Sequence, residues 1–94
     1  MNVKLIRMWS GEDVIADLLD DGPDTITIMN PLVAVPQPSG MSFAPWSPLL
    51  KEKNMDITLK QSYVVMITET QPEVEDFYKE QFSVIKAPSK KLIV

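Results

Sequence analysis

The 94-residue sequence contains no cysteine and no histidine. Their absence excludes disulfide bonds, zinc fingers, thiol catalysis and histidine-based acid–base catalysis. With three glycines and no internal repeat, the chain does not fit the collagen, solenoid or low-complexity classes. Its length provides one small hydrophobic core. We therefore expect a single domain over residues 1–94 that depends for stability on this core or on a neighbouring subunit.

Basic residues and long apolar runs are also scarce. Nine lysines and arginines oppose 13 acidic residues, and the net charge of −4 has the wrong sign for a general phosphate-binding surface. The stretch Glu12–Asp24 has six acids and no base, whereas the last nine residues contain Lys86, Lys90, Lys91 and no acid. The longest apolar run, Tyr63–Ile67, has five residues, which is too short to cross a membrane. No signal-peptide pattern opens the chain, so we expect a cytoplasmic protein without membrane contact.

Alternating and β-branched residues predict strands in the first half of the chain. The segments Val3–Trp9 and Val14–Leu19 flank a turn in which Gly11 is the residue best able to adopt a positive φ, and this pattern predicts an antiparallel hairpin. A long strand is predicted over Thr25–Val35, where Pro31 must either bend the strand or lie at a sheet edge. Such a bend is one way in which a sheet curls into a barrel.

The second half of the chain predicts less regular strands. We expect an irregular strand over Met41–Leu50, and its Pro45 and Pro48 indicate that one side of it lacks an ordinary partner within the chain. Ile57–Leu59 is a short alternating segment. Tyr63–Ile67 is the most apolar segment of the sequence, and we predict that it is a strand buried on both faces.

Residues 70–83 form the one segment that strongly predicts a helix. Thr70–Glu73 fits a capping box, with Pro72 in the first turn. One apolar stripe follows, formed by Val74, Phe77, Tyr78 and Phe82. We therefore predict a mostly β fold, with a small barrel of five or six short strands over residues 1–69, a C-terminal helix over 70–83 and a basic, then apolar tail over 84–94.

The polar residues form no recognisable catalytic or metal-binding motif. Asp20–Asp24 lacks the alternating oxygen ligands and distal glutamate of a calcium loop, so we interpret the acidic residues as a solvated face. Ser10, Ser62 and Thr68 have no histidine to activate them. Lys60 lies near Ser62, but a lysine exposed at a turn is a poor general base. We predict no enzymatic activity, no catalytic residues, no bound metal and no cofactor.

The role of four aromatic side chains can be interpreted in two ways. These residues are Trp9, Phe43, Trp46 and Tyr63. They could form a stacking platform for unpaired bases. Aromatic residues of so small a protein more often fill its core or a subunit interface, and we favour this second interpretation.

Several short motifs follow a known order. The first group comprises Val3-x-Leu5, Gly11, Val14-Ile15-Ala16-x-Leu18, Asp20 or Asp21, and Ile26-x-Ile28. The second group comprises Ile57-x-Leu59-Lys60 and Val64-Val65-x-Ile67. Together they resemble the two motifs of the Sm-like (LSm) family. Over nearly the whole chain the sequence is similar to the Sm-like proteins of T4-type marine cyanophages, a likeness carried by Trp9–Asp17, Pro45–Pro48 and the helix over Pro72–Phe82.

This resemblance implies a strongly bent, five-stranded antiparallel barrel of the SH3 type that assembles into a homo-oligomeric ring. In the family, the fourth strand of one subunit pairs with the fifth strand of the next, and these strands correspond here to Met41–Leu50 and Tyr63–Thr68. The implied interface residues are Ser42, Phe43, Trp46, Tyr63, Val64, Val65 and Met66. An apolar last strand and a proline-bearing neighbour suit a sheet that is completed by another chain.

The resemblance also implies a site for single-stranded RNA at Asp24, Lys60 and Gln61. The sequence departs from the family there, since Gly22–Thr25 contains neither the usual aromatic residue nor the usual asparagine, and Lys60-Gln61 replaces an Arg-Gly pair. A lysine cannot stack on a base as a guanidinium can. We predict a non-enzymatic ring protein of phage origin, located in the host cytoplasm, that acts as an RNA- or RNP-associated scaffold. The alternative is a ring-shaped protein-interaction scaffold that binds no nucleic acid.

Overall fold

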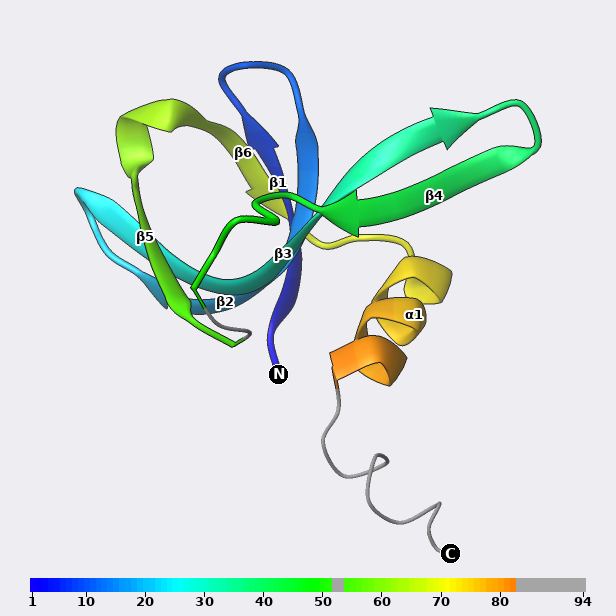
Figure 1. Ribbon diagram of the computed structural model, residues 1–94. Helices are drawn as coiled ribbons and strands as arrows, with labels where there is room; N and C mark the ends of the chain where they lie inside the picture. Colours follow the sequence, from blue (N-terminus) through cyan, green and yellow to red (C-terminus); the bar gives the residue numbers. More distant parts are fainter. Residues whose placement is uncertain (52–53, 83–94) are drawn as a thin grey trace, which may run out of the picture.

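The computed structural model describes residues 1–51 and 54–82, which form a six-stranded antiparallel sheet and one α-helix (Figure 1). The elements are β1 (Val3–Met8), β2 (Asp13–Asp21), β3 (Thr25–Gln37), β4 (Gly40–Pro45), β5 (Asp56–Lys60), the 3-10 helix η1 (Gln61–Tyr63), β6 (Val64–Thr68) and α1 (Pro72–Phe82). The strand order is β4-β3-β2-β1-β6, and β5 also pairs with β3. The predicted mostly β fold with a C-terminal helix is confirmed, although the described residues contain six strands where the resemblance implied five.

The predicted β1–β2 hairpin is confirmed. The two strands are antiparallel, with Val3 opposite Asp17 and Arg7 opposite Asp13. Gly11 lies in the turn with a φ of 101°, a backbone conformation that costs little for a residue without a Cβ. The turn residue thus has the conformation that the sequence predicts for it.

A bulge bends β3 near its middle, where the sequence predicts an irregularity. Asn30 and Pro31 lie together opposite Ala16 in the β2–β3 pairing, and Asn30 has a φ of 52°. At the same point the other side of β3 changes partner, because Thr25–Met29 pairs with β5 and Leu32–Gln37 pairs with β4. A bulge increases local twist and bends a strand, so β3 curves from one part of the sheet to the other (Figure 1).

The sheet buries apolar side chains on both faces. The first core cluster contains Ile6, Met8, Val14, Ala16, Leu18, Ile26 and Ile28. The second core cluster joins the other face to α1 and contains Val3, Ile15 and Tyr78, with Leu5, Leu32, Phe43, Val74 and Phe82 packed around them. β1 contributes to both clusters, which is why its sequence is apolar on both faces rather than on one.

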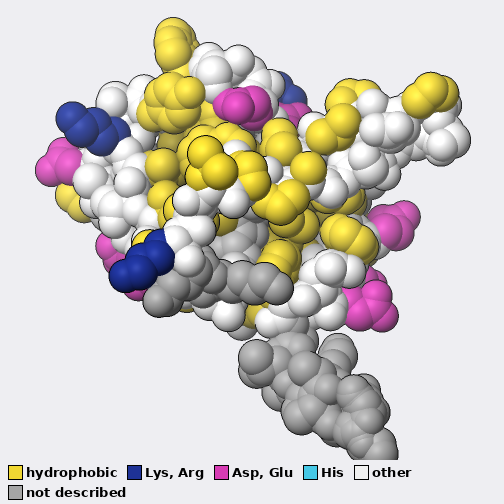
Figure 2. Space-filling model, viewed as in Figure 1, with side chains coloured by type: hydrophobic (Ala, Val, Ile, Leu, Met, Phe, Trp, Pro, Cys, Tyr) yellow, Lys and Arg dark blue, Asp and Glu magenta, His cyan; other side chains and the backbone are white. Residues whose placement is uncertain are grey.

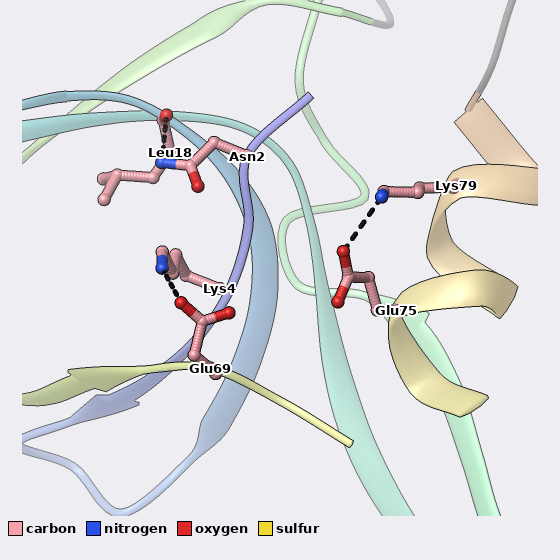
Figure 3. Close-up of polar contacts among 6 residues, drawn as sticks. All are labelled: Asn2, Lys4, Leu18, Glu69, Glu75 and Lys79. Atoms are coloured by element: carbon pink, nitrogen blue, oxygen red, sulfur yellow. Dashed lines mark hydrogen bonds and ion pairs between the residues drawn. The ribbon is translucent and has the colours of Figure 1, made fainter. Parts of the chain in front are cut away.

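The helix α1 begins at Pro72, and its predicted apolar stripe is confirmed. Its members Val74, Tyr78 and Phe82 belong to the second core cluster. Phe77 stacks on Phe43 of β4, with ring centroids 5.3 Å apart. On the outer side of the helix, Lys79 Nζ lies 2.9 Å from Glu75 Oε2 (Figure 3). The described helix ends at Phe82; residue 83 of the predicted helix and the tail over 84–94 lie outside the described residues.

Tyr78 connects the helix to the bend in β3. Its side chain is fully buried, and the single proton of its hydroxyl is shared between the carbonyl oxygens of Met29 (2.8 Å) and Asn30 (3.0 Å). The same hydroxyl accepts a hydrogen bond from the backbone N–H of Asp17 at 3.0 Å. Burial raises the pKa of the Tyr78 phenol, so the group stays protonated and able to donate. One side chain therefore satisfies backbone groups on both strands beside the bulge.

Two expectations for the second half of the chain are wrong. β4 ends at Pro45 rather than at Leu50, because a proline has no N–H to continue the ladder and Pro48 follows closely. The segment Tyr63–Ile67 is not buried on both faces of this chain, since Tyr63 is 39% exposed and Val65 is 52% exposed. The reason is positional: β6 lies at the end of the strand order rather than in its middle.

Replacing Tyr78 by phenylalanine should destabilise the fold. Tyr78→Phe keeps the ring but leaves buried backbone groups beside the bulge without their partner, so the free energy of unfolding should fall by about 1–3 kcal/mol in urea denaturation. The control is Ser62→Ala, which also removes one hydroxyl but at an exposed position, and it should change stability by less than about 0.5 kcal/mol. Equal effects of the two variants would contradict the role assigned to Tyr78.

Candidate functional site

β6 forms an open edge of the sheet. Among the described strands it pairs with β1 alone. The β1–β6 register shifts between Arg7 and Met8, so that Val65 is an extra residue on β6, and its side chain is 52% exposed. The free side of such a strand presents N–H and C=O groups on which another strand can pair. β6 thus combines free backbone groups with an exposed apolar side chain.

Two aromatic residues extend this edge beyond the end of β6. The backbone N–H of Trp9 donates to the carbonyl oxygen of Tyr63 at 2.7 Å, which continues the pairing of β1 past Met8. Trp9 is 74% exposed and Tyr63 is 39% exposed. We call Trp9, Tyr63 and Val65 the β6 apolar edge. So large an exposed tryptophan beside an open strand is typical of an interaction surface.

The opposite side of the sheet is also open. β4 lies at the other end of the strand order, and the Trp46–Leu50 segment continues from it. Met41 is 57% exposed, Leu49 is 93% exposed and Leu50 is 38% exposed. We call these three residues the β4 apolar edge. Figure 2 shows exposed hydrophobic side chains in the middle of the viewed face and at the far end of the β3–β4 hairpin.

The structure divides the predicted interface residues between these two edges. Ser42 and Phe43 lie on β4 with Trp46 just after it, and Tyr63 immediately precedes Val64, Val65 and Met66 on β6. Three of the seven are engaged within the chain: Phe43 stacks on α1, and Trp46 and Val64 pack against the first core cluster. Met66 is half-buried beside Arg7. Ser42, Tyr63 and Val65 are the exposed members.

A chain of hydrogen bonds holds Trp46 in place. Trp46 Nε1 donates to Glu12 Oε2 at 3.3 Å, and the other oxygen of Glu12 accepts from the hydroxyl of Ser10. Ser10 Oγ in turn accepts from the hydroxyl of Tyr63 at 2.9 Å. The Trp46 backbone N–H donates to the carbonyl oxygen of Pro31 at 3.0 Å. The segment after β4, the β1–β2 turn and η1 are thereby connected to one another.

The hairpin carries a charged pair beside the β6 edge. Arg7 Nε and Nη2 donate to the two carboxylate oxygens of Asp13 at 2.7 and 3.0 Å, a bidentate geometry. The hydrogen bond and charge of Arg7 lower the pKa of Asp13. The pair is exposed enough that its net contribution to stability is small.

The residues predicted to bind RNA meet at the β2–β3 turn. The Gln61 N–H donates to the Asp24 carbonyl oxygen at 2.9 Å. The Gln61 side-chain amide donates to both Asp21 Oδ1 and the Gly22 carbonyl oxygen at 2.8 Å. Lys60 lies next to Gln61, at the end of β5. Both side-chain amide hydrogens of Gln61 are thus used in hydrogen bonds to the turn. Lys60 is the one lysine among the three predicted RNA-binding residues, and its neighbour Gln61 is bonded to Asp21 and Asp24.

Within residues 1–51 and 54–82, no three acidic side chains are grouped so that they could hold a metal ion. In the same part of the chain, no helix has the length and apolar character needed to cross a membrane. No protein-family model matches the sequence, and no curated protein is significantly similar to it. The function must therefore be inferred from the geometry of the chain itself.

Sequence reasoning missed three residues of the two apolar edges. Met41 and Leu49–Leu50 belong to the predicted strand Met41–Leu50; Met41 lies on β4, whereas Leu49 and Leu50 follow the end of the strand at Pro45. For Trp9 the sequence favours the core or a subunit interface over a base-stacking platform, and its 74% exposure within one chain excludes the core. The usable signal was the apolar pair Leu49–Leu50 directly after Pro48, a position where a strand cannot continue.

Loss of the Glu12 carboxylate should loosen the hydrogen-bonded connection to Trp46. Glu12→Ala removes the acceptor of two hydrogen bonds, so the free energy of unfolding should fall by about 1–2 kcal/mol. Tryptophan fluorescence should shift to longer wavelength as Trp46 becomes more hydrated. Glu80→Ala, at an exposed position near the end of α1, is the control and should leave both readouts unchanged. If Glu12→Ala changes neither the fluorescence spectrum nor the stability, the hydrogen bonds through Glu12 do not position Trp46.

Proposed function

We propose that this chain is a non-enzymatic Sm-like protein whose copies join edge to edge into a closed ring that serves as a scaffold. The strand order supports this proposal, because β4 and β6, the regions that the resemblance places at the ring interface, lie at its opposite ends. The bulge at Asn30–Pro31 supports it as well, since the Sm-like third strand is strongly bent. A structural role also fits a sequence without histidine or cysteine.

The main observation in support of the proposal is the position of the exposed apolar side chains. Among the described residues, eight large hydrophobic side chains are exposed, and six of them belong to the two apolar edges. The six are Trp9, Met41, Leu49, Leu50, Tyr63 and Val65; the other two are Met1 and Leu19. Two different apolar edges on one chain favour a head-to-tail contact, which closes into a ring when the rotation between copies permits.

A scaffold for proteins is the function that the β2–β3 turn supports best. A phosphate at this turn would meet the carboxylates of Asp21 and Asp24, while Lys60 is the cation next to Gln61. The Gln61 amide, which could otherwise read a base edge, donates both of its hydrogen bonds to the turn. Single-stranded RNA stays the second candidate ligand because the fold brings Asp24 beside Lys60 and Gln61, which come from a distant part of the sequence.

Self-association should be measurable directly. Light scattering and native mass spectrometry of the full chain should give one multimeric mass that does not grow with protein concentration. Val65→Lys should reduce this mass to that of the monomer, because assembly would bury an unpaired charge. The control is Leu19→Lys, at an exposed position outside both edges, which should leave the mass unchanged. A monomeric native chain would refute the proposal.

RNA binding separates the two candidate scaffolds. We expect oligo(U) and oligo(A) to show no measurable binding to the assembled protein even at low ionic strength, because the turn is acidic. Salt-dependent binding that falls tenfold or more in Lys60→Ala, and is retained in the control Lys79→Ala on α1, would establish the RNA-associated scaffold instead. Fluorescence anisotropy across a salt series provides this measurement.

A further inference from the structure

We infer that the tail docks on its own chain, where Val84 and Ile85 cover a small apolar patch formed by Met1 and Leu19. We call these two residues the hairpin patch, because both lie at the open end of the β1–β2 hairpin. This surface is separate from the two apolar edges, and the docking does not depend on self-assembly. Three features of the molecule support the inference: the position of the patch, the path of the chain after α1, and the charges on the two sides.

The β1–β2 pairing continues before Val3 and brings the two patch residues together. The Leu18 N–H donates to the Asn2 carbonyl oxygen at 2.8 Å, and the Asn2 side-chain amide donates to the Leu18 carbonyl oxygen at 3.3 Å (Figure 3). One step further in this antiparallel register, Met1 stands opposite Leu19. Their exposed fractions are 57% and 45%. The hairpin patch is therefore a cross-strand pair of large apolar side chains that is open to water.

The hairpin patch continues the sheet face on which α1 packs. Side chains alternate along a strand, so Met1 is on the face of Val3 and Leu5, and both of these belong to the second core cluster or pack on it. Tyr78 and Phe82 of α1 pack in the same cluster. The helix thus covers this face as far as Val3, and the hairpin patch is the next part of the face.

The chain that follows α1 begins close to the hairpin patch. Phe82 packs in the cluster that contains Val3, and Figure 1 shows α1 running toward the end of the molecule where the N-terminus lies. Val84 and Ile85 follow Phe82 by two and three residues, so their Cα atoms lie within about 7–11 Å of its Cα atom. They are the apolar side chains of the tail that are nearest to the hairpin patch along the chain.

The charges around the patch and in the tail are opposite. Three acidic residues lie within two positions of Leu19; they are Asp17, Asp20 and Asp21. Three basic residues and no acid follow Ile85; they are Lys86, Lys90 and Lys91. Exposed ion pairs contribute little stability each, so the apolar contact supplies most of the binding free energy and the charges select the partner. The tail is therefore the occupant that fits both the apolar and the acidic character of this surface.

A docked tail has two consequences for the rest of the surface. Met1 and Leu19 are the two exposed large hydrophobic residues that belong to neither apolar edge, and docking covers both. It also brings the tail lysines toward the acidic β2–β3 turn, where the aspartates compete with phosphate groups for them. The tail thus acts as a latch that holds its own apolar and basic residues away from other partners.

Disulfide trapping within one chain tests the docking, since the sequence has no native cysteine. Leu19→Cys and Ile85→Cys are combined in the full-length chain, which is oxidised briefly at low protein concentration. Mass spectrometry of the intact, non-reduced protein should show an internal disulfide at a yield at least tenfold above that of the control, Thr58→Cys with Ile85→Cys. Thr58 is an exposed residue of β5. Val84→Cys replaces Ile85→Cys in a second pair of chains, because adjacent side chains point in different directions.

The charge contribution is tested by adding Lys86→Glu to the chain with Leu19→Cys and Ile85→Cys. This change should lower the disulfide yield about threefold, because it places like charges together. The control Lys51→Glu changes the net charge equally at an exposed position outside the tail and should leave the yield unchanged. Equal yields from these two variants would contradict the role assigned to the tail lysines.

Two results would overturn the docking itself. One is a yield no higher than that of the Thr58 control at both tail positions. The other is covalent dimers in place of the internal disulfide, because they would place the tail on a second copy. A high internal yield from a chain that light scattering shows to be monomeric would support the docking and refute the proposed self-assembly, so the two proposals can fail separately.

Discussion

A β-sheet with a free edge on each side is the constraint on which the rest of this protein depends. Each outer strand pairs on one side only, and unpaired N–H and C=O groups are usually covered, twisted away or protected by charge. Here the side chains along both edges are apolar instead, with Trp9 and Val65 on one side and Leu49 on the other. A small core contributes limited stability, which is why we propose that another copy adds a strand to this sheet.

The bend in β3 determines where these edges lie. The bulge at Asn30–Pro31 lets one strand pair with β5 along its first part and with β4 along its second part. Tyr78 holds this bulge through three hydrogen bonds to β2 and β3. Because α1 packs its apolar stripe on a face of the sheet, it stabilises the bend without supplying a strand to either edge. The helix therefore stabilises the single chain from a face of the sheet and pairs with neither β4 nor β6.

The parts of the fold that local chemistry dictates could be predicted from the sequence. The β1–β2 turn at Gly11, the irregularity at Pro31 and the helix from Pro72 are confirmed because each depends on residues close together in the chain. The pairing of β5 with the start of β3 could not be predicted, since it joins segments about thirty residues apart. The same holds for the Tyr78 hydroxyl, whose acceptors are on β3. Burial of Tyr63–Ile67 was predicted from apolar content, which does not reveal whether a side chain is covered by its own chain or by another.

Amide hydrogen exchange along β6 in the native protein tests the central claim most directly. If a second copy completes the sheet, the amides of Val64–Thr68 that face away from β1 should exchange as slowly as those that are bonded to β1, and they alone should lose this protection on dilution to the monomer. Fast exchange of these outward-facing amides at concentrations where β1 is fully protected would show that the edge is unpaired in solution, and would contradict the account.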